Sequence, residues 1–267
     1  MTSPLISTHE LIGSLEDNAI FDVRWSLANP GHGADAYAEG HIPGAVFVDL
    51  ETDLAAPSGE GRHPLPTAAE FSRTLGRLGL GPADDVVVYD DVGGAVAARL
   101  WWMLHSIGHL GEVRVLDGGI QAWTQDGFPL ETEPVVPVRT DYPPVARFRG
   151  VVTHDELGGR FIVDVRAPER YRGETEPVDP KAGHIPGAVN YPLEGNLEDG
   201  RFRSPESLAD RYRGFPDRGI VSCGSGVNAC HAALALVVAG RPIPDVYVGS
   251  FSDWSRRDLP VATGPEP

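Results

Sequence analysis

The sequence predicts an α/β fold of two similar halves, each built on a mainly parallel sheet with helices on both faces. Two observations support this prediction. Short apolar runs alternate along the chain with segments of helical periodicity, which is the pattern of parallel sheets covered by helices on both sides. In addition, short sequence motifs of the first half recur in the second half in the same order, which indicates two copies of one fold.

The individual elements follow from these patterns. Runs rich in Val, Ile and Phe predict buried strands at residues 19–23, 86–89, 113–116, 161–165 and 220–222. Apolar residues at helical spacing predict helices at residues 67–78, 97–107, 205–212 and 231–239. In the last of these helices nearly every position is apolar, so we expect it to be buried against the sheet.

The internal repeat is clearest in a short box. Gly-His-Ile-Pro-Gly-Ala-Val occurs at residues 40–46 and again at 183–189, and each copy follows an Asp-Val-Arg triplet, at 22–24 and 164–166. Further on, residues 116–123 resemble residues 247–254. We expect the polar residues of the boxes to be structural, because both halves carry them and only one half ends the corresponding strand in a cysteine.

A proline-rich stretch separates the two copies. Residues 133–144 contain four prolines and no apolar period, which is typical of a linker between domains. We therefore predict a first domain over residues 1–132, a linker over 133–148 and a second domain over 149–267.

Composition limits the class of partner. The 267 residues include 38 acidic and 22 basic ones, for a formal net charge of −16. So acidic a surface repels nucleic acids and anionic membranes, and we expect neither as a partner. No run of apolar residues is long enough to span a bilayer and no secretion signal precedes the first half, so we expect a cytoplasmic protein.

Cysteine is scarce in this chain. The two cysteines, Cys223 and Cys230, have the spacing of neither a disulfide framework nor a zinc site, and we expect no metal and no cofactor. We interpret Cys230, on the predicted helix, as a small buried apolar residue. A reducing compartment suits a reactive thiol at Cys223.

Cys223 follows the predicted strand 220–222 and precedes a glycine-containing loop and a helix. Backbone N–H groups at a helix start stabilise the thiolate, which is the reactive form of cysteine. An isolated cysteine is more often a core residue, but the strand, loop and helix together favour a reactive one. Asp90 occupies the equivalent position in the first half. The N–H groups that would surround the sulfur belong to the loop residues Gly224, Gly226, Val227, Asn228 and Ala229.

These motifs together resemble those of a known family. The two Gly-His-Ile-Pro-Gly-Ala boxes, Trp101-Trp102-Met103 and the loop at residues 223–227 are similar to those of the tandem-domain rhodanese and 3-mercaptopyruvate sulfurtransferase family. The resemblance implies two rhodanese-like domains, of which only the second is catalytic. It also implies that Cys223 takes a sulfur from a small anionic donor as a persulfide and passes it to cyanide or a thiol, such as that of a thioredoxin-like protein.

The resemblance also implies which residues assist Cys223. Ser225 matches a loop serine that acts with a histidine and an acid of the first domain, for which His63 and Glu51 are the candidates, with Asp49 as a weaker alternative to Glu51. Arg170, assisted by Arg172, is expected to bind the carboxylate of the donor. The family's second arginine is missing from the segment 176–181, and Lys181 is the candidate to replace it.

Three questions stay open at this stage. The neutral Gly224 and Ser225 favour the monocarboxylate 3-mercaptopyruvate over thiosulfate, but thiosulfate as the main donor is the alternative. A regulatory or sulfur-carrier module without catalysis is the second alternative. A cysteine phosphatase is the third, and it is disfavoured because the arginine that such enzymes need six residues after the cysteine is Ala229 here.

Overall fold

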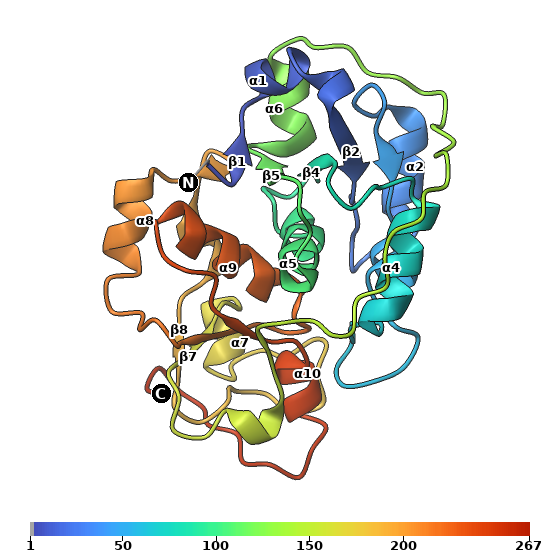
Figure 1. The fold of residues 1–267 in the computed structure, drawn as a ribbon. Helices are drawn as coiled ribbons and strands as arrows, with labels where there is room; N and C mark the ends of the chain where they lie inside the picture. Colours follow the sequence, from blue (N-terminus) through green and yellow to red (C-terminus); the bar gives the residue numbers. More distant parts are fainter. Residues whose placement is uncertain (1–2) are drawn as a thin grey trace. The chain divides into compact units, whose positions relative to one another are not determined.

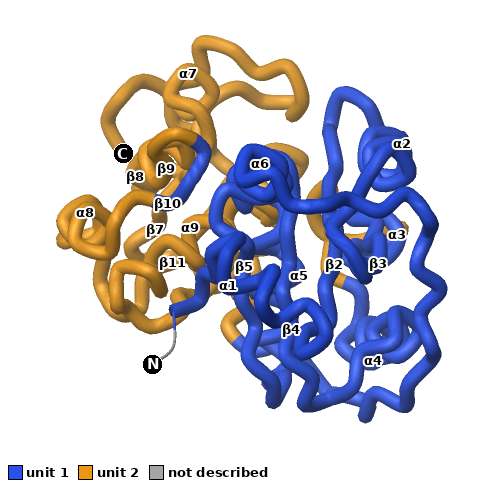
Figure 2. Tube along the Cα trace, turned by 90° about the horizontal axis from the view of Figure 1, so that it is seen from above, with its two compact units in different colours: residues 1–56, 66–149, 200–202 blue, residues 57–65, 150–199, 203–267 orange. Residues whose placement is uncertain are grey.

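The computed structural model describes residues 3–267, which form two compact units. Unit 1 comprises the residues up to 56, residues 66–149 and residues 200–202; unit 2 comprises residues 57–65, 150–199 and 203–267. Figure 2 colours the two units. The segment 57–65 precedes the proline-rich stretch in the chain and nevertheless packs with unit 2, which matters for the site below.

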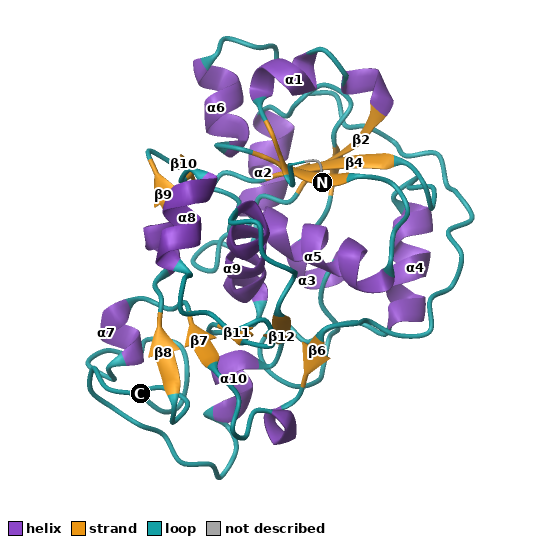
Figure 3. Cartoon of the chain, turned by 60° about the vertical axis from the view of Figure 1, so that its left-hand side comes forward, coloured by secondary structure: helices purple, strands orange, loops and turns teal. Residues whose placement is uncertain are grey.

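Unit 1 contains a five-stranded sheet in the order β1-β5-β4-β2-β3, and all its strand pairs are parallel. The strands are β1 (Leu5–Ile6), β2 (Asn18–Asp22), β3 (Val46–Phe47), β4 (Asp85–Tyr89) and β5 (Val113–Leu116). The helices are α1 (Thr8–Ile12), α2 (His32–Glu39), α3 (Leu50–Asp53), α4 (Ala68–Arg77), α5 (Ala97–Ile107) and α6 (Gly119–Gln125), with a 3-10 turn at Leu15–Asp17. In Figures 1 and 3, α1 and α6 lie on one face of this sheet and α4 and α5 on the other.

Unit 2 repeats this topology. Its five-stranded parallel sheet has the order β6-β12-β11-β7-β8, which is the same order as in unit 1 when each unit is counted from its own first strand. The strands are β6 (Val151–Val152), β7 (Ile162–Asp164), β8 (Ala188–Asn190), β11 (Ile220–Ser222) and β12 (Asp245–Tyr247). The helices are α7 (Pro168–Tyr171), α8 (Pro205–Arg211), α9 (Val227–Val238) and α10 (Ser250–Trp254), with 3-10 turns at His154–Glu156 and Leu193–Asn196. The short strands β9 (Leu197–Glu198) and β10 (Arg201–Phe202) lie outside these sheets.

The predicted fold class, two halves with mainly parallel sheets and helices, is confirmed. The helix predicted at residues 97–107 has those bounds, and the one predicted at 231–239 begins earlier, at Val227. Helix α9 is buried almost throughout, as its continuous apolar pattern predicts. Among residues 3–267, none of the helices combines the length and the apolar character needed to cross a lipid bilayer.

The repeated boxes have the same structural role in each unit. Arg24 binds the Asp22 carboxylate through two nitrogens and donates to the carbonyl of Gly40 at 2.8 Å. Arg166 makes the equivalent bonds to Asp164 and to the carbonyl of Gly183, the latter at 2.6 Å. Each arginine thereby fastens the end of a central strand to the start of the box.

The box histidines are equally symmetric. The Nδ1 atom of His41 lies 2.9 Å from the carbonyl of Tyr37, and that of His184 lies 2.8 Å from the carbonyl of Tyr171. Each ring also stacks on the tyrosine, with centroids 3.9 and 3.8 Å apart. Both histidines are fully buried, which supports the structural role expected from the sequence.

Residues 133–149 of the proline-rich stretch run along unit 1. The N–H of Thr140 donates to the carbonyl of Gly76 at 3.0 Å, and the ring of Phe148 stacks on that of Trp102. Valines 136 and 138 remain more than four-fifths exposed. The segment is therefore an extended chain that contacts unit 1 at a few positions.

Candidate active site

Cys223 lies directly after β11, at the carboxyl edge of the sheet of unit 2, where ligands of parallel α/β sheets bind. Its Sγ accepts a hydrogen bond from the N–H of Gly226 at 3.1 Å, and the side chain is 3% exposed. The hydroxyl of Ser250 lies 3.9 Å from the same sulfur. The sulfur is thus buried and accepts a hydrogen bond from the backbone of the loop that follows it.

Gly226 gives the loop its shape. Its φ of 79° is in the left-handed region, and a Cβ at this position would lie 2.3 Å from the carbonyl oxygen of Val248. Only glycine fits there. The tight turn directs the Gly226 N–H back at the sulfur and starts α9 immediately afterwards.

Helix α10 is hydrogen-bonded to the loop that begins at Cys223. The N–H groups of Phe251 and Ser252 donate to the carbonyls of Cys223 and Gly224, at 3.0 and 2.8 Å. The hydroxyl of Ser250 accepts from the N–H of Cys223 at 3.1 Å and lies 2.8 Å from the carbonyl of Tyr247. Ser250 makes these contacts with a φ of 52°, a backbone conformation that is costly for any residue other than glycine.

Ser225 and His63 are in contact. The Nδ1 of His63 lies 2.9 Å from the hydroxyl oxygen of Ser225, and both residues are buried. The segment 57–65 brings His63 here because it packs on α10. Gly61 approaches Gly249 so closely that a Cβ would lie 2.6 Å from its carbonyl oxygen, and the N–H of Arg62 donates to the hydroxyl of Ser252 at 2.9 Å.

Two guanidinium groups flank the loop. A Cβ on Gly224 would lie 3.1 Å from Nη2 of Arg62 and 3.6 Å from Nη1 of Arg170. The carboxylate of Asp179 lies between the two arginines, accepting from Arg62 at 2.9 Å and from Arg170 at 3.2 Å. The loop therefore has two guanidinium groups beside it that share one carboxylate.

A second buried acid completes this network. Glu176 accepts from Arg170 at 2.6 Å and from Arg166 at 3.3 Å. Burial acts to raise the pKa of Glu176, but the hydrogen bonds from Arg170 and from the N–H groups of Asp179 and Val178 outweigh it, and the pKa lies below its ordinary value. The carboxylate is thereby kept charged and holds Arg170 in place.

The other two cations expected at the site are engaged elsewhere. Arg172 forms an exposed ion pair with Glu174, with Nε to Oε1 at 2.7 Å. Lys181 donates to the carbonyls of Arg257 and Leu259, at 2.7 and 3.2 Å. The structure thus groups Arg170 with the loop and gives Arg172 and Lys181 other partners.

The acid candidates lie in unit 1. Glu51 is an exposed residue of the short helix α3, and the carboxylate of Asp49 caps that helix by accepting from the N–H groups of Glu51 and Thr52. A role for Glu51 in proton transfer stays a prediction.

The remaining predicted loop residues, Val227, Asn228 and Ala229, lie in the first turn of α9. Val227 and Ala229 are buried, whereas Asn228 is exposed, so Asn228 offers the site its backbone rather than its side chain. The thiol of Cys230 is fully buried and donates to the carbonyl of Gly226 at 3.3 Å.

Sequence reasoning missed four of these residues: Arg62, Glu176, Asp179 and Ser250. The available signal for Arg62 was its place directly before His63. For Ser250 it was a difference between the repeats, because the equivalent residue of the first half is Gly119, with a φ of 58°. Asp179 needed the tertiary structure.

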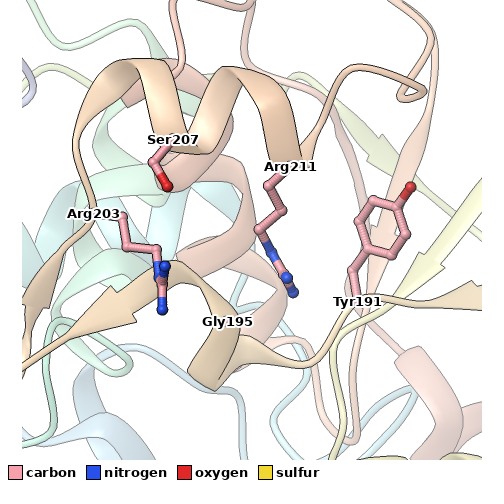
Figure 4. A pocket seen from close by; sticks show the side chains of 5 residues that line it. All are labelled: Tyr191, Gly195, Arg203, Ser207 and Arg211. Carbon is pink, nitrogen blue, oxygen red and sulfur yellow. The ribbon is translucent and has the colours of Figure 1, made fainter.

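Two other features of unit 2 do not carry a ligand function. A cavity of about 510 Å³, shown in Figure 4, is lined by Tyr191, Gly195, Arg203, Ser207 and Arg211. Arg211 donates to the side chain of Asn196 and the carbonyl of Pro192, and Arg203 donates to the carbonyl of Leu197. Their guanidinium groups already have protein acceptors.

The second feature is a group of possible metal ligands, Glu60, His154 and Asp253. The guanidinium of Arg257 occupies it, donating to Glu60 at 2.7 Å and to Asp253 at 2.9 Å and lying 3.2 Å from Nε2 of His154. The cluster is an ion-pair group around an arginine.

Comparisons with known proteins found similar sequences and structures. The family described as Rhodanese-like domain matches residues 7–126 and 152–257. A Pseudomonas aeruginosa protein named "Probable 3-mercaptopyruvate sulfurtransferase" is 44% identical over 98% of this chain and 99% of its own length. The thiosulfate sulfurtransferase of Rattus norvegicus is 35% identical over 96% of this chain and 93% of its own. The solved structure of 3-mercaptopyruvate sulfurtransferase from Leishmania major matches with a TM-score of 0.86 and 32% identity, covering 95% of this chain and 74% of that one.

Proposed function

This chain belongs to the tandem-domain rhodanese and 3-mercaptopyruvate sulfurtransferase family and is a sulfurtransferase, and we propose that it carries the transferred sulfur as a persulfide on Cys223, with 3-mercaptopyruvate as the preferred donor. The observation that supports this most directly is the position of the Cys223 sulfur. It faces the Gly226 N–H at 3.1 Å, next to a loop residue that two guanidinium groups approach.

The first half-reaction breaks the carbon–sulfur bond of the donor. The Cys223 thiolate attacks the sulfur of 3-mercaptopyruvate, a sulfur–sulfur bond forms, and the bonding electrons leave with the carbon as the enolate of pyruvate. The proton of the donor thiol is free to protonate that carbon. One proton therefore moves from the donor thiol to the enolate carbon, and no external oxidant is needed.

Ser225 and His63 are the groups that we assign to this proton transfer. Their contact at 2.9 Å allows a proton to pass between the serine hydroxyl and the imidazole. Glu51 is the proposed acid of this relay, and Glu51→Gln tests it: a fall in kcat with 3-mercaptopyruvate supports the role, and an unchanged kcat removes Glu51 from the mechanism.

The second half-reaction returns the enzyme to its starting state. Cyanide or an acceptor thiolate attacks the outer sulfur of the persulfide, and thiocyanate or a new persulfide leaves with the Cys223 thiolate re-formed. Both cysteines of the protein are free, which supports a reducing compartment, and we propose the cytoplasm as the location and a thioredoxin-like thiol as one acceptor.

Thiosulfate is the second candidate donor. The two guanidinium groups near Gly224 supply cations that the loop sequence itself lacks, and a relative named thiosulfate sulfurtransferase covers nearly the whole chain. Against it, the buried carboxylates of Glu176 and Asp179 offset the charges of Arg62 and Arg170. A site close to neutral suits a monoanion better than a dianion.

Two measurements test the proposal. Intact mass after exposure to each donor should show a gain of one sulfur atom that is lost in Cys223→Ser. Steady-state kinetics with both donors should give a higher kcat/KM for 3-mercaptopyruvate. No mass gain with either donor would favour a sulfur-carrier or binding module, and a strong preference for thiosulfate would reverse the order of the donors.

A further inference from the structure

Two guanidinium nitrogens near Gly224 have no acceptor. Arg62 Nη2 and Arg170 Nη1 are the atoms nearest to the Gly224 position, and within residues 3–267 neither donates a hydrogen bond. The Nε of Arg62 is also buried without a partner. An unpaired buried N–H such as this Nε is unfavourable in a folded protein, and a ligand that accepts from it would relieve the cost.

We propose that Arg62 is a donor-binding residue, and that it forms with Arg170 the two-arginine site for the anionic group of the sulfur donor. This inference rests on the proposed function and gives Arg62 the role that the sequence assigned to Lys181. The site would accept an oxyanion, the carboxylate of 3-mercaptopyruvate or the sulfonate oxygens of thiosulfate, next to the loop that holds Cys223.

The position of Arg62 is fixed from three sides. The backbone N–H of Arg62 donates to the hydroxyl of Ser252, and its Nη1 donates to Asp179 at 2.9 Å. The preceding residue, Gly61, lies in close contact with Gly249. The side chain of Asp179 is fully buried. Because Asp179 also binds Arg170, one carboxylate sets the spacing of the two guanidinium groups and directs their remaining N–H groups toward Gly224.

The other two cations expected at the site have partners elsewhere in the protein. Lys181 is bound by two backbone carbonyls and Arg172 by Glu174. A purely structural Arg62, a tether between the segment 57–65 and Asp179, is the competing explanation. It accounts for the bond from Nη1 but leaves the buried Nε without a partner.

The first experiment replaces Arg62 with Gln and with Lys in the full-length protein. Loss of a charge-assisted bidentate contact should raise KM for the preferred donor about tenfold or more in both variants, since lysine keeps the charge but lacks the planar fork. Arg170→Gln should act in the same direction. Arg213→Gln removes an exposed arginine of unit 2 that pairs with Asp210, and it should leave KM unchanged.

The two half-reactions separate this inference from the proposed function. The variants are loaded to completion with excess donor, and the discharge of the persulfide to cyanide is then timed. We expect discharge at the wild-type rate, because the donor has already left. Wild-type protein that never gains sulfur refutes the proposed function, whereas wild-type KM values in Arg62→Gln refute the role of Arg62 alone.

The lysine variant distinguishes binding from tethering. Lysine at position 62 keeps a cation for the ion pair with Asp179 but lacks the planar fork of arginine. A KM raised in Arg62→Lys, measured at a temperature where thermal unfolding shows the variant to be folded, supports the binding role. A wild-type KM in Arg62→Lys beside a raised KM in Arg62→Gln shows that Arg62 acts only as a tether, and it overturns the inference.

Discussion

Asp90 and Cys223 end equivalent strands, β4 and β11, and each directs its side chain at the N–H groups of the loop that follows. The Asp90 carboxylate accepts four of them, from Val92, Gly94, Val96 and Ala97, at 2.8 to 2.9 Å. Unit 1 thus holds a carboxyl group in the position where unit 2 holds the Cys223 sulfur. Burial raises the pKa of Asp90, and the four N–H groups act in the opposite direction by stabilising its charged form.

This equivalence predicts the geometry of the persulfide. The path from Cβ through Cγ to Oδ in aspartate has as many bonds as the path from Cβ through Sγ to the outer sulfur. Helix α9 begins sooner after Cys223 than α5 does after Asp90, so the corresponding donors of unit 2 are expected among the N–H groups of residues 225–229. A crystal structure of the sulfur-loaded enzyme should place the outer sulfur within hydrogen-bond distance of at least two of them. An outer sulfur directed away from the loop would contradict the comparison.

The same contacts predict a large stability effect in unit 1. Asp90→Ala leaves four N–H groups without their acceptor, three of them in buried hydrogen bonds, and the free energy of unfolding should fall by about 2 kcal/mol or more. In thermal unfolding the Tm should be lower by about 4 °C or more. Asp35→Ala, at an exposed position of α2, is the control and should shift Tm little. Equal Tm values for the two variants would show that the loop of unit 1 does not need this carboxyl group.

Ser225 and His63 should matter for one donor and not for the other. Transfer from 3-mercaptopyruvate moves a proton from sulfur to carbon, whereas thiosulfate carries no proton and releases sulfite without gaining one. Ser225→Ala and His63→Gln should therefore lower kcat about a hundredfold with 3-mercaptopyruvate. With thiosulfate the rate should stay within a few-fold of wild type. Equal losses with both donors would mean that the pair shapes the loop rather than moves a proton.

The sequence predicted the parts of the site that are local and missed those that are tertiary. A strand, a cysteine and a helix in succession predict the Cys223 loop, because each element has its own pattern. The two-residue strands β1, β3 and β6 have no periodic signal. Arg62 was overlooked because its importance comes from a contact with Asp179, 117 positions away. Lys181 was expected to bind the donor because its charge is visible in the sequence, while the backbone carbonyls that bind it are not.

Glu176 predicts part of the response to acid. Its folded-state pKa lies below the ordinary value of 4.5, so its contribution to stability is complete above about pH 4.5 and is lost as the pH falls through the folded value. Glu176→Gln should lower Tm at neutral pH, and the gap between variant and wild type should narrow below pH 4.5. Glu39→Gln, at an exposed position, corrects for the loss of one titrating carboxyl group. A gap that is constant with pH would mean that the charge of Glu176 does not support Arg170.

Ser250 has a strained backbone conformation and contacts Cys223 through its hydroxyl. Its counterpart Gly119 has nearly the same positive φ, 58° against 52°, so unit 1 uses the residue that this backbone favours and unit 2 does not. The hydroxyl explains the difference, because it accepts the Cys223 N–H and donates to the carbonyl of Tyr247. Ser250→Gly and Ser250→Ala both remove the hydroxyl and should lower the rate of persulfide formation up to about tenfold, because the buried N–H of Cys223 loses its acceptor. Only the glycine variant relieves the strain, so its Tm should exceed that of the alanine variant. Full activity in Ser250→Gly would show that the sulfur does not need this hydroxyl, and the strain would then have no functional cause.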